Sequence, residues 1–223
     1  MKDIKKVIKE IKEYIDTDIS EIVEYHENKN RKEKRGCGHH SIACLIFCCI
    51  DYLSAIVYGK KNANPVKFME EYFKNDYKQK ALLIYKMWRH GTVHENDPKV
   101  LTDGSKYVGW CSVLLSAEEN RKEHLKVYLK KDNPKQYCIV LNLPQLLIDL
   151  KNSIEKLIGS LNTNDKLLYS LSKNYEKMTK AKNVNSINKL KEQFNNAIKI
   201  AAPNKVLDQK GCVRDKQKYA HDK

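Results

Sequence analysis

The sequence predicts a mainly α-helical domain with a small antiparallel β insertion. Apolar residues recur at three- and four-residue steps along most of the chain, which is the spacing of amphipathic helices. In the middle of the chain this pattern changes to alternation, where Leu125, Val127 and Leu129 are separated by polar or aromatic residues. Asp132-Asn133-Pro134 follows as a turn signal. We therefore expect a helical bundle that a β hairpin interrupts.

The N-terminal segment, residues 1–40, is expected to consist of an amphipathic helix over 2–26 and a basic linker over 28–40. Lysine and glutamate cover most of the helix surface, which predicts that its apolar stripe packs against the rest of the protein. This stripe contains Ile4, Val7, Ile8, Ile11, Ile15, Ile19, Ile22 and Val23.

Residues 41–58 are apolar on every side, which predicts a helix at the centre of the bundle. Gly59 is expected to end this helix. Pro65 suits the first turn of the next one, at about 65–75. The central segment is also the one candidate for a membrane span, but it is slightly short and contains Asp51. We therefore expect a buried helix and no membrane association.

A further helix is predicted over about 78–90, and we call it the motif helix. It carries Arg89 and His90 to its C-terminal end. Gly91 is expected to let the backbone leave helical geometry there, and His94 lies one short bend further on. The apolar face of the motif helix contains Ala81, Leu82, Ile84, Tyr85 and Trp88.

The remaining segments complete the predicted organisation. Residues 41–165 form a helical core with the β insertion at about 106–142, and its last helix covers about 144–162. Residues 166–202 contribute C-terminal helices with a weaker final one near 187–198. Residues 203–223 are polar and are expected to be a mobile tail.

The chain has 223 residues, a formal net charge of +14 and a pI near 9.3. Such a charge favours a polyanionic partner such as RNA. A proteome biased toward lysine and asparagine would give the same charge, because the lysines are spread along every helix. The N-terminus lacks the apolar core of a secretory signal, so we expect reduced cysteines and a cytoplasmic protein.

Metal and cofactor binding are not expected. The cluster Cys37-Gly38-His39-His40 has no second pair spaced to complete a tetrahedral site. Cys44, Cys48 and Cys49 lie in the apolar central helix, where free cysteine behaves as a small hydrophobic residue. The sequence has no phosphate-cradling glycine loop and no zinc-finger spacing.

Arg89 and His94 are the candidate catalytic residues, and His90 is a candidate supporting residue. Cleavage of RNA without metal needs proton transfer from the 2′-hydroxyl and to the leaving 5′-oxygen, and histidine can perform either step near neutral pH. Arginine can contact two phosphate oxygens and stabilise the developing charge. The structural alternatives are an arginine that caps its helix and a histidine satisfied within its loop.

Arginine followed by histidine at similar spacing also occurs at Arg35…His40 and Arg214…His221. The first arginine lies in the predicted basic linker and the second in the polar tail. Of the three, only Arg89 is carried by a helix that a core would hold in place.

The string Arg89-His90-Gly91-Thr92-Val93-His94 resembles the Arg-x(4–6)-His motif of the HEPN superfamily, in which a polar residue often follows the arginine. Residues 42–95 also resemble uncharacterised bacterial HEPN-like proteins. The resemblance covers about 41–165 and implies a helical bundle. The hairpin after the motif departs from the family pattern.

The resemblance implies that the protein is a metal-independent ribonuclease that leaves 2′,3′-cyclic phosphate and 5′-hydroxyl ends. It implies a homodimer whose two motifs line one cleft, and a toxin–antitoxin or antiviral defence setting with an antitoxin or defence-system partner. Some family members have lost activity. The alternative is therefore an inactive HEPN-like module that binds nucleic acid or a protein partner.

Overall fold

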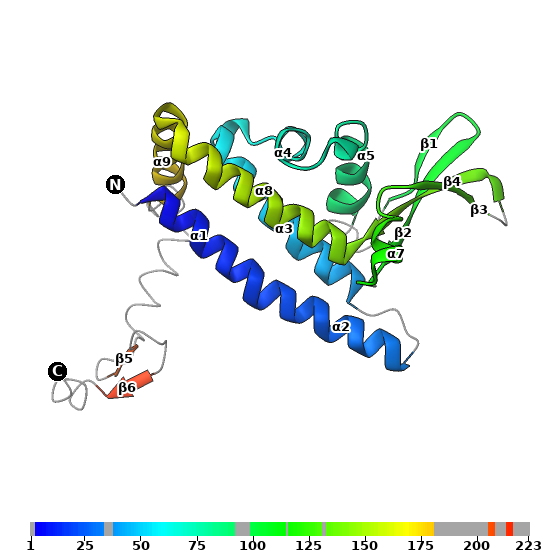
Figure 1. Ribbon diagram of the computed structural model, residues 1–223, viewed down its shortest axis with the longest axis horizontal. Helices are drawn as coiled ribbons and strands as arrows, with labels where there is room; N and C mark the ends of the chain where they lie inside the picture. The colour runs from blue at the N-terminus through cyan, green and yellow to red at the C-terminus, as the bar shows by residue number, and fades with distance from the viewer. Residues whose placement is uncertain are drawn as a thin grey trace, which may run out of the picture. The chain divides into compact units, whose positions relative to one another are not determined.

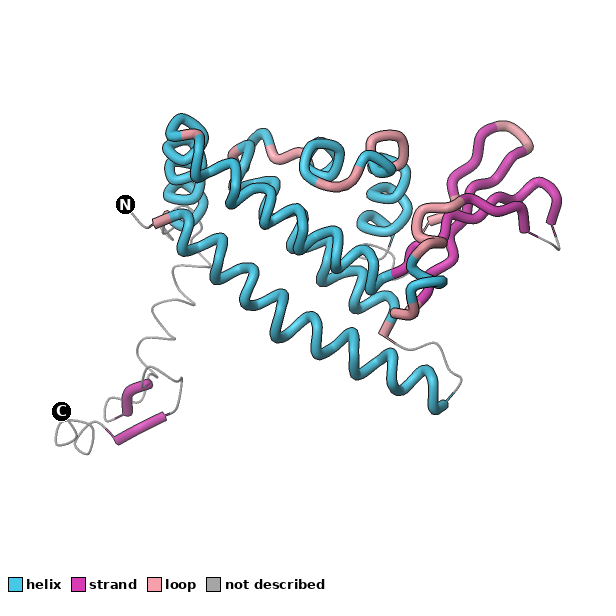
Figure 2. The backbone as a smooth tube through the Cα atoms, in the orientation of Figure 1, coloured by secondary structure: helices cyan, strands magenta, loops and turns pink. Residues whose placement is uncertain are grey.

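A computed structural model describes residues 3–33, 38–91, 99–114, 116–130 and 133–180, and the backbone of 205–207 and 213–215. Contacts divide the chain into two units, Met1–Thr179 and Lys180–Lys223. The first unit is mainly helical and carries one four-stranded sheet (Figures 1 and 2). The predicted helix near 187–198 lies outside the described residues. The second unit contains an antiparallel strand pair, β5 (Lys205–Leu207) and β6 (Val213–Asp215).

The predicted N-terminal amphipathic helix is confirmed, and it is longer than expected. One continuous run consists of α1 (Ile4–Tyr14), a π-helical turn (Ile15–Ile19) and α2 (Ser20–Glu33). Figure 1 shows this run alongside α8 (Leu143–Thr163), which both helices contact. The predicted linker is correspondingly shorter, because no glycine or proline interrupts residues 28–33. Residues 34–37 lie outside the described part of the chain.

The central helix, α3 (His39–Tyr58), contacts α4 (Pro65–Tyr72), α8 and α9 (Asp165–Thr179) and buries most of its apolar residues. Gly59 ends it with a φ of 83°, a left-handed value that suits glycine. The Asn174 side chain donates to the carbonyls of Ile56 and Val57 and so satisfies two of the last carbonyl groups of the helix.

The central helix lies among the other helices as predicted, but they do not cover it on every side. Cys48 is exposed and Tyr52 keeps 39% of its surface accessible. The reason is that α1 and α9 flank this face without closing over it, and the gap is an apolar groove of about 410 Å³. Cys48 and Tyr52 both line that groove.

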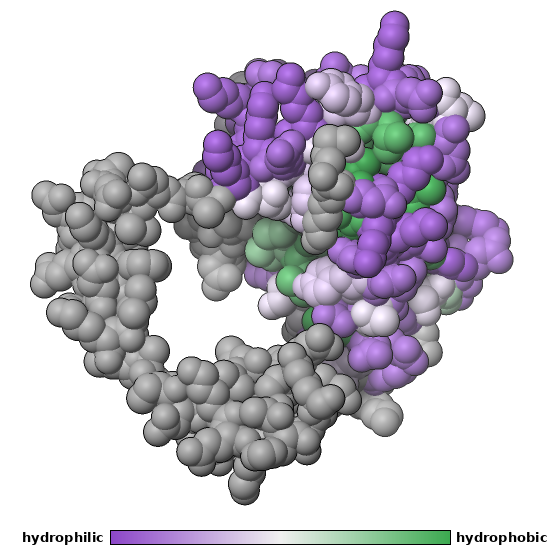
Figure 3. All heavy atoms as spheres, turned by 90° about the vertical axis from the view of Figure 1, so that its left-hand side faces the viewer, coloured by the Kyte–Doolittle hydropathy of each residue, from purple (hydrophilic) through white to green (hydrophobic). Residues whose placement is uncertain are grey.

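Among the described residues, α3 is the one helix long and apolar enough to cross a membrane. Half of its apolar window is buried inside the structure, where α3 contacts neighbouring helices. The surface of the protein is mainly hydrophilic on the face that Figure 3 shows, with apolar patches between the hydrophilic residues.

Short helices lead from α3 to the motif helix. Asn64 caps α4 by accepting a hydrogen bond from the Lys67 amide at 3.0 Å, and Pro65 occupies the first turn as predicted. The segment contains a 3₁₀ turn (Lys60–Asn62), α4 (Pro65–Tyr72), a second 3₁₀ turn (Asn75–Tyr77), α5 (Ala81–Ile84) and a π-helical segment (Tyr85–His90).

The predicted β insertion is present, but its sheet is mixed and not wholly antiparallel. The strands are β1 (Leu101–Asp103), β2 (Lys106–Val113), β3 (Val127–Lys130) and β4 (Asn133–Asn142), in the order β1-β2-β4-β3. The β3–β4 hairpin is antiparallel as expected, whereas β2 pairs with β4 in parallel. The connection after β2 contains the short helix α7 (Glu118–Arg121), and this crossover brings β2 beside β4.

The alternation at 125–129 predicted one buried and one exposed face, and β3 does not show that division. Val127 and Leu129, which were expected on the buried face, are 47% and 53% exposed, and Tyr128 of the opposite face is 45% exposed. β3 is an edge strand of the sheet. Leu125 precedes the strand and is buried with a φ of 63°, which is unusual for a residue other than glycine.

The structure confirms the helix predicted at about 144–162 and a helix at the start of the predicted segment 166–202. Helix α8 follows β4 directly, and Asn142 caps it by accepting a hydrogen bond from the Gln145 amide at 2.9 Å. Helix α9 (Asp165–Thr179) packs against α3 and α8. The buried face of α8 includes Leu147, Leu150, Ile154, Leu157 and Leu161.

Candidate functional site

The motif helix places Arg89 and His90 in the π-helical segment Tyr85–His90. Gly91 has a φ of −62° and a ψ of −57°, so the expectation that it leaves helical geometry is wrong. The next described residue is Lys99, whose amide donates to the Met87 carbonyl at 2.9 Å. His94 lies between these two points and outside the described residues.

Arg89 is held by a carboxylate of the central helix. Its Nε donates to Asp51 Oδ2 at 2.6 Å, and the Tyr85 hydroxyl donates to Asp51 Oδ1 at 2.8 Å. Both members of the ion pair are partly accessible, with 20% of the Arg89 side chain and 25% of the Asp51 side chain exposed. The contact uses Nε, and the two terminal amino groups of a guanidinium carry four further donors.

His90 contacts Tyr85 through its ring, edge-on, with 5.5 Å between the ring centroids. Tyr85 therefore joins both motif residues, because its hydroxyl bonds to the carboxylate that holds Arg89. Trp88 anchors the same turn and is almost fully buried. It packs against Trp110 of β2 at 5.3 Å between ring centroids, and both tryptophans contact the His40 ring edge-on.

The protonation states at this site follow from its contacts. Burial lowers the pKa of Arg89, but its hydrogen bond and ion pair with Asp51 outweigh that effect, and the net pKa is raised. Burial and the bond to Asp51 also raise the pKa of the Tyr85 hydroxyl. At neutral pH the site therefore presents a permanent cation and a protonated tyrosine that donates to Asp51.

Replacing Asp51 by alanine should lower the free energy of unfolding by about 1–3 kcal/mol, because it removes the acceptor of two hydrogen bonds, one from a charged group. Asp51→Asn should cost less, since it keeps the shape and one carbonyl acceptor. Urea unfolding of the purified variants measures both effects.

The matched control for Asp51 is Glu118→Ala, which breaks the solvated ion pair between Glu118 and Lys122. Both side chains of that pair are largely exposed, so its loss should change the free energy of unfolding by less than about 1 kcal/mol. An equal decrease in the free energy of unfolding in the Asp51 and Glu118 variants would show that the Arg89–Asp51 pair stabilises the protein no more than a surface pair does.

Cys48 and Cys49 of α3 are weakly acidic thiols. Burial raises the pKa of Cys49 to about 12, and burial together with neighbouring Cys44 raises the pKa of Cys48. A thiol binds metal or acts as a nucleophile as the thiolate, so these values disfavour both functions. Cys49 and Cys44 are partly buried as packing residues should be, whereas the packing assignment of Cys48 is wrong because it is exposed.

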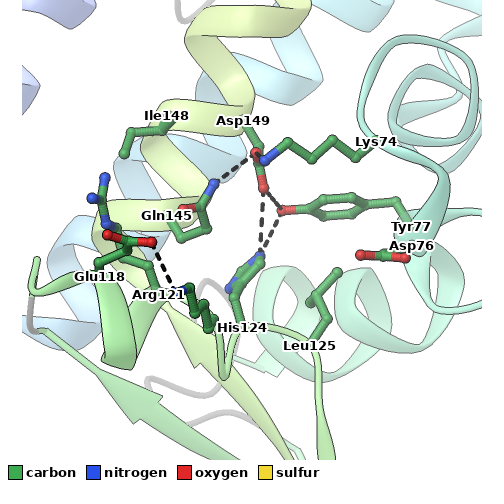
Figure 4. A pocket seen from close by; sticks show the side chains of 11 residues that line it. Lys74, Asp76, Tyr77, Glu118, Arg121, His124, Leu125, Gln145, Ile148 and Asp149 are labelled. Atoms are coloured by element: carbon green, nitrogen blue, oxygen red, sulfur yellow. Dashed lines mark hydrogen bonds and ion pairs between the residues drawn. The ribbon is translucent and has the colours of Figure 1, made fainter.

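A second polar cluster lies inside the protein, between the 3₁₀ turn before the motif helix and α8. The Tyr77 hydroxyl donates to Asp149 Oδ2 at 3.1 Å and contacts His124 Nε2 at 2.7 Å (Figure 4). His124 Nδ1 accepts a hydrogen bond from the Asn142 amide at 3.0 Å, so the ring proton is assigned to Nε2. The three side chains are almost fully buried.

His124 is a neutral, structural residue at neutral pH. Burial lowers its pKa to about 3, and the positive charges of Lys74 and Lys80 act in the same direction. Its Nε2 lies 3.8 Å from Asp149 Oδ2, but with so low a pKa this contact is not an ion pair. The cluster therefore fixes the β insertion to the helices through hydrogen bonds among a neutral imidazole, a hydroxyl and one buried carboxylate.

Stability should fall as the pH is lowered from about 6.5 to 5, because His124 resists protonation in the fold. Below pH 6.5 the unfolded chain binds a proton at this imidazole that the folded chain does not bind. The free energy of unfolding should decrease by up to about 1.4 kcal/mol per pH unit from this residue alone. Tyr77, Asp149, Lys74 and Lys80 face His124.

Urea unfolding at pH 7, 6 and 5 tests this pH dependence, with His124→Asn as the control that removes the titrating group. The variant should be less stable at pH 7 and should show a flatter pH profile. Parallel profiles for wild type and variant would assign the pH dependence to other groups.

Sequence reasoning missed Asp51 as a partner of Arg89 and the whole Tyr77–His124–Asp149 cluster. A signal for Asp51 existed, because a carboxylate in an otherwise apolar helix needs a partner when it is buried. No sequence spacing connects Tyr77, His124 and Asp149, which come from three separate elements.

Within the described ranges, no group of three or more His, Cys, Asp or Glu side chains could hold a metal ion. Cys37 of the cluster at 37–40 lies outside those ranges. Searches of protein-family models, of curated proteins and of solved structures gave no match to this chain.

Proposed function

We propose that this protein is a metal-independent RNA endonuclease of the HEPN type and that Arg89 binds the scissile phosphate. The observation that supports this most strongly is the placement of Arg89. A carboxylate fixes its Nε at 2.6 Å, the side chain remains partly exposed, and a buried tryptophan anchors the turn that carries it. A preorganised cation of this kind can stabilise charge that develops on a phosphate.

His94 is proposed as the acid/base group. It follows Gly91 by three residues, and three residues span at most about 11 Å. The proposal that Arg89 and His94 share one site therefore requires no long-range contact. His90, held against Tyr85, is proposed as a supporting residue.

The reaction needs two proton transfers, one from the attacking 2′-hydroxyl and one to the leaving 5′-oxygen. One protomer offers His94 and His90, and a two-fold homodimer would offer Arg89 and His94 twice. We propose such a dimer, with RNA as substrate, in the cytoplasm. A toxin–antitoxin or antiphage setting, with an antitoxin or defence-system protein as partner, is part of the same proposal.

The test of this chemistry uses paired RNA substrates. Cleavage should leave 2′,3′-cyclic phosphate and 5′-hydroxyl ends, which mass spectrometry of the products identifies. An otherwise identical substrate with a single 2′-deoxyribose at the mapped cleavage position should be intact there, because it lacks the internal nucleophile. Cleavage of the deoxy position at an unchanged rate would require a different mechanism.

A second candidate function is an inactive HEPN-like module that binds nucleic acid or a protein. The same ion pair supports it, because an arginine neutralised by Asp51 can be a purely structural residue. The two functions differ in one measurement. The module would retain RNA binding, with a salt dependence set by its lysines, and would produce no cleaved ends.

A further inference from the structure

A cleft of about 510 Å³ lies over the Tyr77–His124–Asp149 cluster, between the 3₁₀ turn Asn75–Tyr77, helix α7 and helix α8 (Figure 4). Ligand sites of proteins commonly have this volume. The motif residues Arg89 and His90 do not line it. The cleft lies between the β insertion and the helices, and it is separate from the proposed catalytic site.

The floor of the cleft carries a carboxylate whose charge is already satisfied. Asp149 Oδ1 accepts hydrogen bonds from Gln145 Nε2 at 2.9 Å and contacts Lys74 Nζ at 3.1 Å. Asp149 Oδ2 accepts from the Tyr77 hydroxyl. With its oxygens engaged in this way, Asp149 leaves little negative charge to repel an incoming anion.

The cations and carboxylates of the cleft lining largely pair with one another. Lys74 Nζ lies 3.1 Å from Asp149 Oδ1 at the floor, and Lys122, which follows helix α7, pairs with Glu118 at 2.9 Å. Arg121, the last residue of α7, is a lining cation that forms no ion pair within the described part of the chain. Figure 4 places Asp76, the other carboxylate of the lining, at the opposite end of the cleft from Arg121.

Arg121 has an unmet hydrogen-bonding requirement. Its Nε is buried and finds no hydrogen-bond partner within the described part of the chain. A buried guanidinium donor without an acceptor costs free energy, and an acceptor supplied by a ligand would remove that cost. Guanidinium groups match the geometry of phosphate oxygens with two parallel hydrogen bonds.

We propose that this cleft binds a phosphate-bearing ligand, with Arg121 as its main contact. The cleft volume accommodates a phosphate ester up to the size of a nucleotide. The phosphate group itself is what the cleft recognises. Its source is either a small phosphate ester or a phosphate of an RNA strand, and the experiment separates the two. This inference does not rest on the proposed RNA cleavage.

Isothermal titration calorimetry of the full chain tests the proposal with inorganic phosphate, adenosine 5′-monophosphate, adenosine and a short RNA. The phosphate-bearing probes should bind, and adenosine should not. Arg121→Gln should weaken binding of the monophosphate about ten-fold or more, because it removes a charge-assisted pair of hydrogen bonds. Lys67→Gln is the matched control, since Lys67 is an exposed cation outside the cleft lining. This variant should bind the monophosphate with the affinity of wild type.

Wild-type protein supplies a second readout that does not depend on folding of the variant. Phenylglyoxal should modify Arg121, and the monophosphate should protect it, as measured by peptide mass spectrometry. Competition between the monophosphate and RNA for an Arg121-dependent site assigns the phosphate to a strand, whereas binding of the monophosphate alone assigns it to a small ester. Absence of phosphate binding, or equal affinity in wild type and Arg121→Gln with no protection of Arg121, would overturn the proposal.

Discussion

Replacing His94 by alanine should lower the rate of RNA cleavage by about 10²–10⁴, the usual contribution of a general acid or base. Replacing Arg89 by alanine should have a comparable effect, because it removes the proposed phosphate ligand from a position fixed by Asp51. Arg89→Lys should restore only part of the lost rate, since an ammonium cannot form two parallel hydrogen bonds to a phosphate. His90→Ala should cost less than either alanine variant.

The chain supplies matched controls for these variants. Arg214 and His221 have arginine-to-histidine spacing similar to that of the motif and lie in the polar C-terminal segment. Arg214→Ala and His221→Ala should leave the cleavage rate unchanged in a single-turnover assay. If the His94 and His221 variants cleaved RNA at the same rate, His94 would not be the acid/base group.

Replacing Tyr77 by alanine should lower the free energy of unfolding by about 3–5 kcal/mol, the usual cost of removing a buried aromatic ring. Tyr77 is 1% exposed and packs edge-on against Phe73 at 4.8 Å between ring centroids. The alanine variant also leaves Asp149 and His124 without their shared hydroxyl. Urea unfolding followed by far-ultraviolet circular dichroism measures the loss.

Two further variants separate the ring of Tyr77 from its hydroxyl. Tyr77→Phe keeps the ring and should cost about 1–3 kcal/mol, because Asp149 Oδ2 and His124 Nε2 lose a buried partner. Tyr169→Phe is the control, since Tyr169 is 61% exposed and its loss of a hydroxyl should change stability by less than about 0.5 kcal/mol. Equal stability of Tyr77→Phe and wild type would contradict the structural role of the cluster.

Hydrophobic periodicity predicted most helices well, because the apolar residues that recur at helical spacing are the residues that these helices bury. The stripe from Leu147 to Leu161 is buried on α8, and Gly59 and Pro65 mark real helix boundaries. Periodicity could not reveal how far the central helix is covered. That depends on the spacing of α1 and α9 around Cys48, which no local pattern encodes.

The β insertion shows why strand pairing is harder to predict than strand position. Alternation located strands near 106–142, but the parallel pairing of β2 with β4 depends on the crossover through α7. The exposed strand β3 has the alternating sequence of a strand with one buried face. Alternation alone does not show whether another layer of the protein covers that face.

The candidate site was predictable at Arg89 and His90, which lie together on an anchored helix. Asp51 was not assigned as the partner of Arg89, because 38 residues separate the two and only the packing of α3 against the motif helix brings them together. The same limit applies to Tyr77 and Asp149, which are 72 residues apart.

Incubation of purified protein with total RNA in EDTA tests the central claim most directly, with an Arg89→Ala, His94→Ala double variant purified in parallel. Electrophoresis should show cleavage by wild type, retained in EDTA and decreasing as salt is added, because RNA binding releases counterions. The double variant should leave the RNA intact. Cleavage that EDTA abolishes, or equal cleavage by wild type and double variant, would contradict metal-independent catalysis by Arg89 and His94.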